Sequence, residues 1–214
     1  MRPKQLIKMA TFVQSILVGG CLVVSGCEGN LGDQLRSQDP QVMAGQSGRI
    51  TNIIEGGGAV VSQINASDSM SWVYVQLSSG KEVMPQDPQN STDWDLALQR
   101  FQIKVNGGIS GKGGVEVALV TGITFPALAT APQSGYVTDK QDSADEDSDP
   151  DYAFVQQGTW YNYNAMTHLL TPKDQVYVVR ATTGAHYKLQ MSGYYDQAGS
   201  SGYPAFRWQL LAAQ

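Results

Sequence analysis

Apolar and polar residues alternate through most of the chain after residue 49. In Val73, Val75 and Leu77 every second residue is apolar, and a period of two is typical of a strand with one buried face. The same pattern recurs at 115–119, 176–180, 187–191 and 206–210. Glycine, proline, aspartate and serine separate these segments, and no long amphipathic helix or fixed repeat interrupts them. The pattern predicts an all-β fold over residues 49–214, a compact antiparallel multi-strand domain of two packed sheets.

The segment TDWDLALQRFQIKVNGGISGKGG, residues 92–114, departs from simple alternation. Its apolar residues change parity between Leu98 and Phe101. Because successive residues of a strand face opposite ways, a bulge or bend near residues 99–100 is predicted to return both apolar sets to one face. Four residues are expected to have structural roles here, with an ion pair between the arginine and one of the aspartates: Asp93, Trp94, Asp95 and Arg100.

The first 26 residues have the organisation of a cleaved signal peptide. Basic residues precede an apolar run that is too short for a membrane-spanning helix. The run ends in Val-Ser-Gly-Cys, and a small-residue cleavage site directly before cysteine resembles the lipobox of bacterial lipoproteins. We expect residues 1–26 to be removed and Cys27 to carry lipid, with an ordinary signal peptide as the alternative. Polar residues without an apolar period predict a flexible tether over residues 27–48.

The composition limits the kinds of partner. The full chain has a net charge of −5, and removal of the signal peptide leaves 11 basic and 19 acidic residues. An acidic chain without a basic tract argues against nucleic acid and against electrostatic docking on anionic lipid, so membrane attachment would depend on the lipid anchor. Cys27 would be the one cysteine left after cleavage, which excludes an intrachain disulfide or a cysteine-based metal site.

Seven acidic residues lie in the run DKQDSADEDSDPD, residues 139–151. A Ca²⁺ site is one hypothesis for this run, because hard cations prefer several carboxylate oxygens. The run lacks the turn glycine of an EF-hand loop, and a solvated acidic loop is the alternative. The candidate metal ligands are Asp142, Asp145, Asp147 and Asp149.

Catalytic chemistry finds little support in the sequence. The glycine-lysine loop departs from a phosphate-binding Walker A motif, because Asn106 and Gly113 replace its first glycine and its final hydroxyl residue. Asp93 and Asp95 could face the same way on a strand and act on a glycoside. No sugar-binding residues accompany them, so a structural role is favoured. With two histidines and two cysteines, the chain also offers no Ser/His/Asp or Cys/His set. We predict a protein that is not an enzyme.

Of the two histidines, His168 has the more informative sequence environment. His168 lies in GTWYNYNAMTHLLTPKD, two residues after Met166. Imidazole and thioether groups both serve as axial ligands of haem iron, and aromatic side chains suit a flat porphyrin. The alternative is that His168 forms a turn hydrogen bond while Met166 packs in the core. The haem-binding candidates are Met166, His168, Tyr161 and Tyr163.

Several segments resemble the HmuY-like haem-binding lipoproteins. WDLALQRFQIKVNGGISGKGG is similar to the family hallmark, in which Trp-Asp-x-Ala-x-x-Arg precedes an alternating strand and Asn-x-Gly-x-Ser-Gly-x-Gly. We therefore call residues 92–114 the hallmark segment. Further similar segments follow in the expected order: WVYVQLSSGKEV at 72–83, SGYVTD at 134–139, GTWYNY at 158–163 and VYVVRATTGAHYKLQMSGYY at 176–195.

The resemblance implies a compact all-β fold that grips haem between two long hairpin-like projections, each with a His or Met ligand. It also implies a lipid-anchored protein of the bacterial cell envelope, on the periplasmic or surface face of the outer membrane. Its role would be iron acquisition, by capturing haem and passing it to a TonB-dependent outer-membrane receptor.

The ligands that the resemblance implies are only partly present. The first projection should lie between Tyr136 and Phe154, where this chain has neither His nor Met. The second should follow Trp160 and contains Met166 and His168. The chain therefore offers one candidate ligand region. Haem with a single axial ligand and haem shared between two molecules are both compatible with this, as is a different ligand, either Ca²⁺ at the acidic run or a protein partner.

Overall fold

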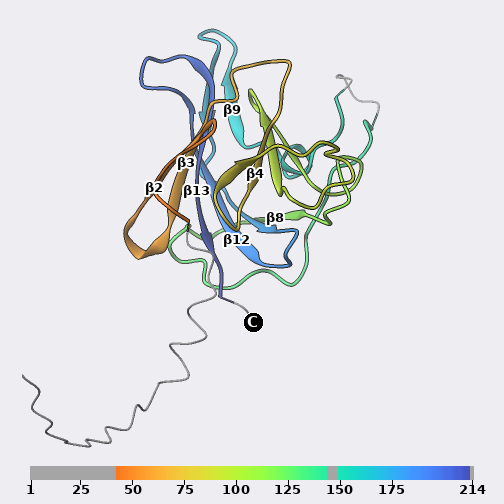
Figure 1. Cartoon of the computed structure of the whole chain (residues 1–214). Coiled ribbons are helices and arrows are strands. Elements are labelled where there is room, and N and C mark those ends of the chain that lie inside the picture. The colour runs from red at the N-terminus through yellow and green to blue at the C-terminus, as the bar shows by residue number, and fades with distance from the viewer. Residues whose placement is uncertain (1–41, 144–148, 213–214) are drawn as a thin grey trace, which may run out of the picture. The chain divides into compact units, whose positions relative to one another are not determined.

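Antiparallel strands form nearly all of the regular structure (Figure 1). The computed structural model describes residues 42–143 and 149–212, which belong to a compact unit beginning at Pro40. Helical elements in these residues are short: the 3-10 turn η2 (Gly56–Gly58) and the helix α2 (Ala153–Gln156). Within the same residues, no helix has the length and apolar character needed to cross a membrane. The all-β prediction is confirmed.

The larger sheet has seven strands, and each neighbouring pair is antiparallel. The strand order is β1 (Gly45–Ser47), β2 (Ile50–Ile54), β3 (Val60–Ile64), β13 (Ser201–Leu210), β12 (His186–Tyr195), β11 (Val176–Arg180) and β8 (Glu116–Val120). The last strand of the chain therefore lies in the middle of the sheet, beside a strand from the N-terminal part.

A smaller sheet and a separate hairpin complete the fold. The four-stranded sheet has the order β5 (Lys81–Val83), β4 (Val73–Gln76), β6 (Leu96–Gln99) and β7 (Gln102–Val105). Strands β9 (Tyr161–Asn164) and β10 (Leu169–Pro172) form a two-stranded hairpin, drawn in cyan at the top of Figure 1. Two packed sheets with a projecting hairpin agree with the predicted fold class.

The two larger sheets share one hydrophobic core. Val73, Val75 and Leu77 are buried, as their alternation predicts. They belong to the same cluster of buried side chains as Phe206 and Trp208 of β13. Because complete burial of a large apolar side chain contributes about 1.5–3 kcal/mol, the packing of one sheet on the other is the main source of stability.

A second, smaller cluster covers the opposite face of the seven-stranded sheet. Val176 and Val178 of β11 pack there against Phe125 and Leu128, from the connection that follows β8. Lys188 of β12 is buried beside them, and its Nζ donates to the carbonyls of Phe125 and Leu128 at 2.9 Å each. Strand β11 is therefore buried on both faces.

The hallmark segment forms a hairpin instead of one bent strand. Strands β6 and β7 pair antiparallel around a two-residue turn, with Leu96 opposite Val105. Residues paired across such a turn have opposite parity, so both apolar sets reach one face without an inserted residue. The turn residue Arg100 has φ 51°, a left-handed conformation that non-glycine residues seldom adopt. The predicted common face is buried except for Phe101, which lies in the turn and is 39% exposed. The predicted bulge or bend is wrong.

The first strand also begins earlier than the domain boundary predicted at residue 49. Strand β1 lies inside the segment 27–48 that was expected to be a tether, and it pairs with residues 50–52 of β2. Its sequence, Gly-Gln-Ser, has no apolar period. An edge strand can be held by backbone hydrogen bonds alone, so it needs no such pattern. Val42 also packs against the core. Cys27, the predicted signal peptide and residues 28–41 of the predicted tether lie outside the described residues.

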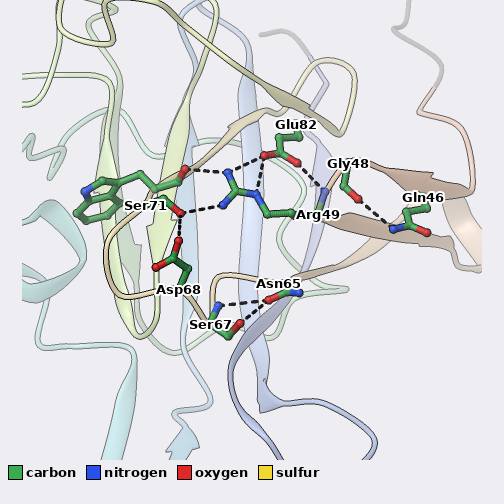
Figure 2. A network of polar contacts seen from close by, with 9 residues as sticks. Gln46, Gly48, Arg49, Asn65, Ser67, Asp68, Ser71 and Glu82 are labelled. Atoms are coloured by element: carbon green, nitrogen blue, oxygen red, sulfur yellow. Dashed lines mark hydrogen bonds and ion pairs between the residues drawn. The ribbon is translucent and has the colours of Figure 1, made fainter.

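An ion pair joins the first hairpin to the smaller sheet (Figure 2). Arg49, at the end of the β1–β2 turn, donates from Nε to Glu82 Oε1 of β5 at 2.8 Å and from its backbone N–H to Oε2 at 2.5 Å. The Glu82 side chain is only 3% exposed. The same guanidinium donates to Ser71 Oγ at 3.1 Å and to the Trp72 carbonyl at 3.0 Å. A buried carboxylate needs such a partner, so the pair fixes the N-terminal hairpin to the rest of the domain.

Candidate functional site

Asp95 of the hallmark segment is buried and accepts hydrogen bonds from both larger sheets. Its Oδ2 accepts from the Leu77 N–H, just beyond β4, at 2.7 Å. Its Oδ1 accepts from the backbone N–H and the Oγ1 of Thr182, in the β11–β12 turn, at 2.8 Å each. Both carboxylate oxygens therefore serve as structural acceptors that hold the two sheets together.

Asn106 makes a similar connection to the glycine-rich loop. Its Nδ2 donates to the carbonyls of Ser91 and Trp94 at 2.9 and 2.8 Å, and its Oδ1 accepts from the Gly113 N–H at 3.0 Å. A Cβ atom at Gly111 would overlap the Asn106 side chain. The loop thus needs glycine because its backbone packs on this buried amide, which is a structural reason for a sequence that resembles a phosphate-binding loop.

Asp93 lies in a different environment from Asp95. It is exposed, and its Oδ2 accepts from Ser91 Oγ at 3.0 Å. Asp95 is buried with both oxygens already bonded. A glycosidase needs two carboxyl groups that both face the substrate. The two aspartates do not form such a pair.

Arg100 is directed away from both aspartates. Its guanidinium donates to the Ser67 carbonyl and to Ser201 Oγ, each at 3.1 Å, and its backbone N–H donates to the Ala66 carbonyl at 2.7 Å. The predicted ion pair with Asp93 or Asp95 is therefore wrong. The reason is the tight β6–β7 turn, which places Arg100 at the opposite end of its strand from the aspartates.

The β6–β7 turn also supports the base of the projecting hairpin. Trp160 Nε1 donates to the Phe101 carbonyl at 2.9 Å, and the Phe101 and Tyr161 rings meet edge to face at 5.8 Å between centroids. On β10, the Leu170 N–H donates to the hydroxyl of Tyr195 at 2.9 Å. Tyr161, one of the four haem candidates, is thus half-buried at the base and forms part of the support.

The outer end of the hairpin brings Tyr163 and His168 together. Tyr163 Oη lies 2.5 Å from His168 Nδ1, although five residues separate them in the chain. Both side chains are exposed. Met166, in the turn between the strands, is 93% exposed. Packing of Met166 in the core, the alternative considered from the sequence, is therefore wrong, and this end of the hairpin offers phenol, imidazole and thioether groups to solvent.

The acidic run begins at a buried carboxyl group. Asp139 is 1% exposed and accepts from the backbone N–H groups of Val105 and Ala153 at 2.9 and 2.8 Å. Burial raises the pKa of Asp139 to about 6, against the effect of these hydrogen bonds and of nearby Lys104. The backbone then pairs Lys140 with Asp151. Asp139 therefore fixes the base of the acidic run and is not part of its solvated surface.

The remaining acidic residues do not form a metal centre in the described part of the chain. Asp142 and Asp149 are exposed, and Asp149 Oδ2 accepts from Gln102 Nε2 at 2.5 Å. Asp145 and Asp147 lie outside the described residues. Among residues 42–143 and 149–212, no three His, Cys, Asp or Glu side chains come close enough to hold a metal ion.

Asn106 and Asp139 are among the buried polar residues that were not identified as structural from the sequence. Each directly follows strand-like apolar residues, Val105 and Val137 with Thr138, and precedes a loop. A polar residue at the end of a buried strand is well placed to bond loop backbone groups. This position at the end of an apolar segment is the sequence signal that could have distinguished Asn106 and Asp139 from neighbouring polar residues that face solvent.

The two packed sheets share polar links at Asp95 and support a hairpin whose outer end exposes Tyr163, Met166 and His168. The chain belongs to the HmuY family: a family model described as HmuY protein matches residues 68–208. No curated protein is significantly similar to the chain in sequence.

Solved structures share the fold. A candidate HmuY-like haem-binding protein of Bacteroides vulgatus ATCC 8482 is 18% identical with a TM-score of 0.52, and the match covers 70% of this chain and 90% of that one. The apo HmuY analog TFO of Tannerella forsythia is 16% identical with a TM-score of 0.54, covering 76% and 97%. A candidate lipoprotein of Bacteroides fragilis NCTC 9343 is 20% identical with a TM-score of 0.52, covering 73% and 93%. These similarities establish the fold alone.

The different environments of the two hallmark aspartates predict different effects of substitution. In Asp95→Asn one acceptor oxygen becomes an amide group that faces N–H donors, so unfolding free energy should fall by about 2 kcal/mol. In Asp93→Asn, at an exposed position, the change should stay within about 0.5 kcal/mol. Urea unfolding followed by tryptophan fluorescence measures both. Equal losses in the two variants would contradict the structural role of Asp95.

Proposed function

We propose that this protein binds haem without catalysing a reaction and serves haem and iron acquisition. The observation that carries the proposal is the exposed Tyr163–His168 pair on the projecting hairpin, whose turn also exposes Met166. Phenol, imidazole and thioether groups each occur as axial ligands of haem iron. Membership of the HmuY family, and the description of the Bacteroides vulgatus structure as a candidate haem-binding protein, support the same conclusion.

The hairpin also supplies apolar surface for a porphyrin. Tyr163 is 53% exposed on the face of the hairpin that also carries Tyr161, and Phe101, which packs on Tyr161 at the hairpin base, is 39% exposed. A flat apolar ligand gains from covering such side chains. The rigid base would hold them in place, so haem binding would require little ordering of the protein.

We extend the proposal to the location of the protein. Residues 1–26 act as a signal peptide, Cys27 carries lipid, and the residues after it tether the domain to the bacterial outer membrane. The lipobox-like sequence before Cys27 supports this assignment, as does the candidate lipoprotein among the structures with the same fold. The acceptor of the haem would be a TonB-dependent outer-membrane receptor.

The anchor is tested by labelling the full chain with radioactive palmitate in a bacterium that processes lipoproteins. The wild type and Cys21→Ala should be labelled, because Cys21 lies within the segment that is removed. Cys27→Ala should lose the label and leave the membrane fraction, since no acyl chain then holds it there. Label retained in Cys27→Ala would contradict the anchor.

Haem binding is tested by titrating ferric haemin into the purified protein and following the Soret band. The wild type should give a shifted, saturable band at micromolar protein. The triple variant Tyr163→Phe, Met166→Ala, His168→Ala should lose it, because the exposed candidate iron ligands of the hairpin are removed and Tyr161 is half-buried in its base.

The matched control for this titration removes exposed methionines elsewhere. Met70 and Met84 are 88% and 82% exposed, so Met70→Ala, Met84→Ala should bind haemin as the wild type does. A wild type without a saturable change would refute the proposed function, and an unaffected triple variant would refute its location on the hairpin.

A further inference from the structure

Tyr163 and His168 form a close hydrogen-bonded pair at the outer end of the hairpin. Tyr163 Oη and His168 Nδ1 are 2.5 Å apart, and the ring centroids are 6.0 Å apart. Both side chains are exposed. A pair held this closely in open solvent is suited to receive a ligand from outside.

The turn keeps the two side chains together through its own backbone. Asn164 Oδ1 accepts from the N–H groups of Met166 and Thr167 at 2.9 and 3.2 Å, and the Asn164 carbonyl accepts from the His168 N–H at 2.8 Å. His168 has φ 57°, a left-handed conformation that is unfavourable for a residue with a Cβ atom and that clusters at functional sites. The pair is therefore formed before any ligand arrives.

The Tyr163 hydroxyl and His168 Nδ1 share one hydrogen bond, and its direction depends on the tautomer of His168. In the tautomer that carries its hydrogen on Nε2, Nδ1 accepts from the phenol. The phenolic oxygen then retains lone pairs that can bind a metal ion, whereas the Nδ1 lone pair is directed at the tyrosine.

We propose, resting on the haem-binding function above, that the axial ligand of ferric haem is the phenolate oxygen of Tyr163 and that His168 is its positioning residue. Tyr163 would hold ferric haem through its phenolate oxygen, with the phenolic proton passed to His168 Nδ1 and the water or chloride on the ferric iron released. His168 would stay hydrogen-bonded to the phenolate and stabilise its charge.

This assignment explains how one projection can suffice. Tyrosinate is a known axial ligand of haem, and an anionic oxygen neutralises part of the charge of ferric iron without a second protein ligand. Met166, which is 93% exposed and lies outside the Tyr163–His168 hydrogen bond, is not needed for it. The acidic run, which has no His or Met, then has no place in iron coordination.

The test compares ferric haemin complexes of the wild type and of Tyr163→Phe, His168→Ala and Met166→Ala by absorption and resonance Raman spectroscopy. The wild type should show the charge-transfer band and phenolate vibrations of an iron(III)–tyrosinate complex. Tyr163→Phe should lose both and bind at least about tenfold more weakly. His168→Ala should keep the phenolate vibrations but bind about 10–100-fold more weakly, because the partner of the ligand is gone. Met166→Ala should match the wild type.

Circular dichroism should show an unchanged fold in each variant, because all three positions are exposed. If the wild type binds haemin but lacks the phenolate signature, or if Tyr163→Phe retains it, the ligand assignment is wrong while haem binding stands. If the wild type does not bind haemin, the proposed function fails, and the assignment fails with it.

Discussion

The buried carboxylate of Asp95 is the interaction on which the arrangement of the two sheets depends. It takes hydrogen bonds from the end of β4 in one sheet and from the β11–β12 turn in the other. An unpaired buried N–H costs more than a typical hydrogen bond contributes, so these turns are held in one relative position. The β6–β7 hairpin begins directly after Asp95, so the hydrogen bonds of Asp95 also fix where this hairpin starts relative to the two sheets.

The support of the candidate site follows from this hairpin. Its turn binds the base of the β9–β10 hairpin through Trp160 and the Phe101 ring, while Tyr195 of β12 holds the opposite strand. The hairpin base is therefore fixed by both larger sheets, and its outer end carries exposed side chains. A rigid base with a solvent-facing end lets the protein present Tyr163 and His168 in a defined geometry without burying them first.

The strands were predictable because their apolar periods are read locally. The β6–β7 turn was not, because a bulge and a two-residue turn both correct a change of parity, and choosing between them requires knowledge of strand pairing. Strand β1 has no apolar pattern to detect. The contrast between Asp93 and Asp95 depends on Thr182, 87 residues later in the chain. Sequence alone shows two equivalent aspartates.

The candidate site was partly predictable for the same reason. The clustering of Tyr161, Tyr163, Met166 and His168 along the chain indicated the segment that forms the β9–β10 hairpin, and the HmuY resemblance suggested haem as the ligand. Their separate positions depend on the hairpin register, which leaves Tyr161 at the base and joins Tyr163 to His168. The structural role of Asp139 likewise depends on its hydrogen bond from the Val105 N–H of β7, 34 residues earlier in the chain. The resemblance implies two equivalent projections. In the described residues, the acidic run begins at the buried Asp139, whereas the hairpin ends in the exposed Tyr163 and His168.

The most direct test is an NMR measurement that locates the bound haem. Ferric haem is paramagnetic and broadens the amide NMR signals of nearby residues, so spectra of the haemin complex can be compared with those of a diamagnetic zinc porphyrin complex. The account predicts broadening confined to the β9–β10 hairpin and to Arg100–Phe101 in the turn that supports it. Broadening centred on Asp142 and Asp149, with the hairpin unaffected, would contradict it.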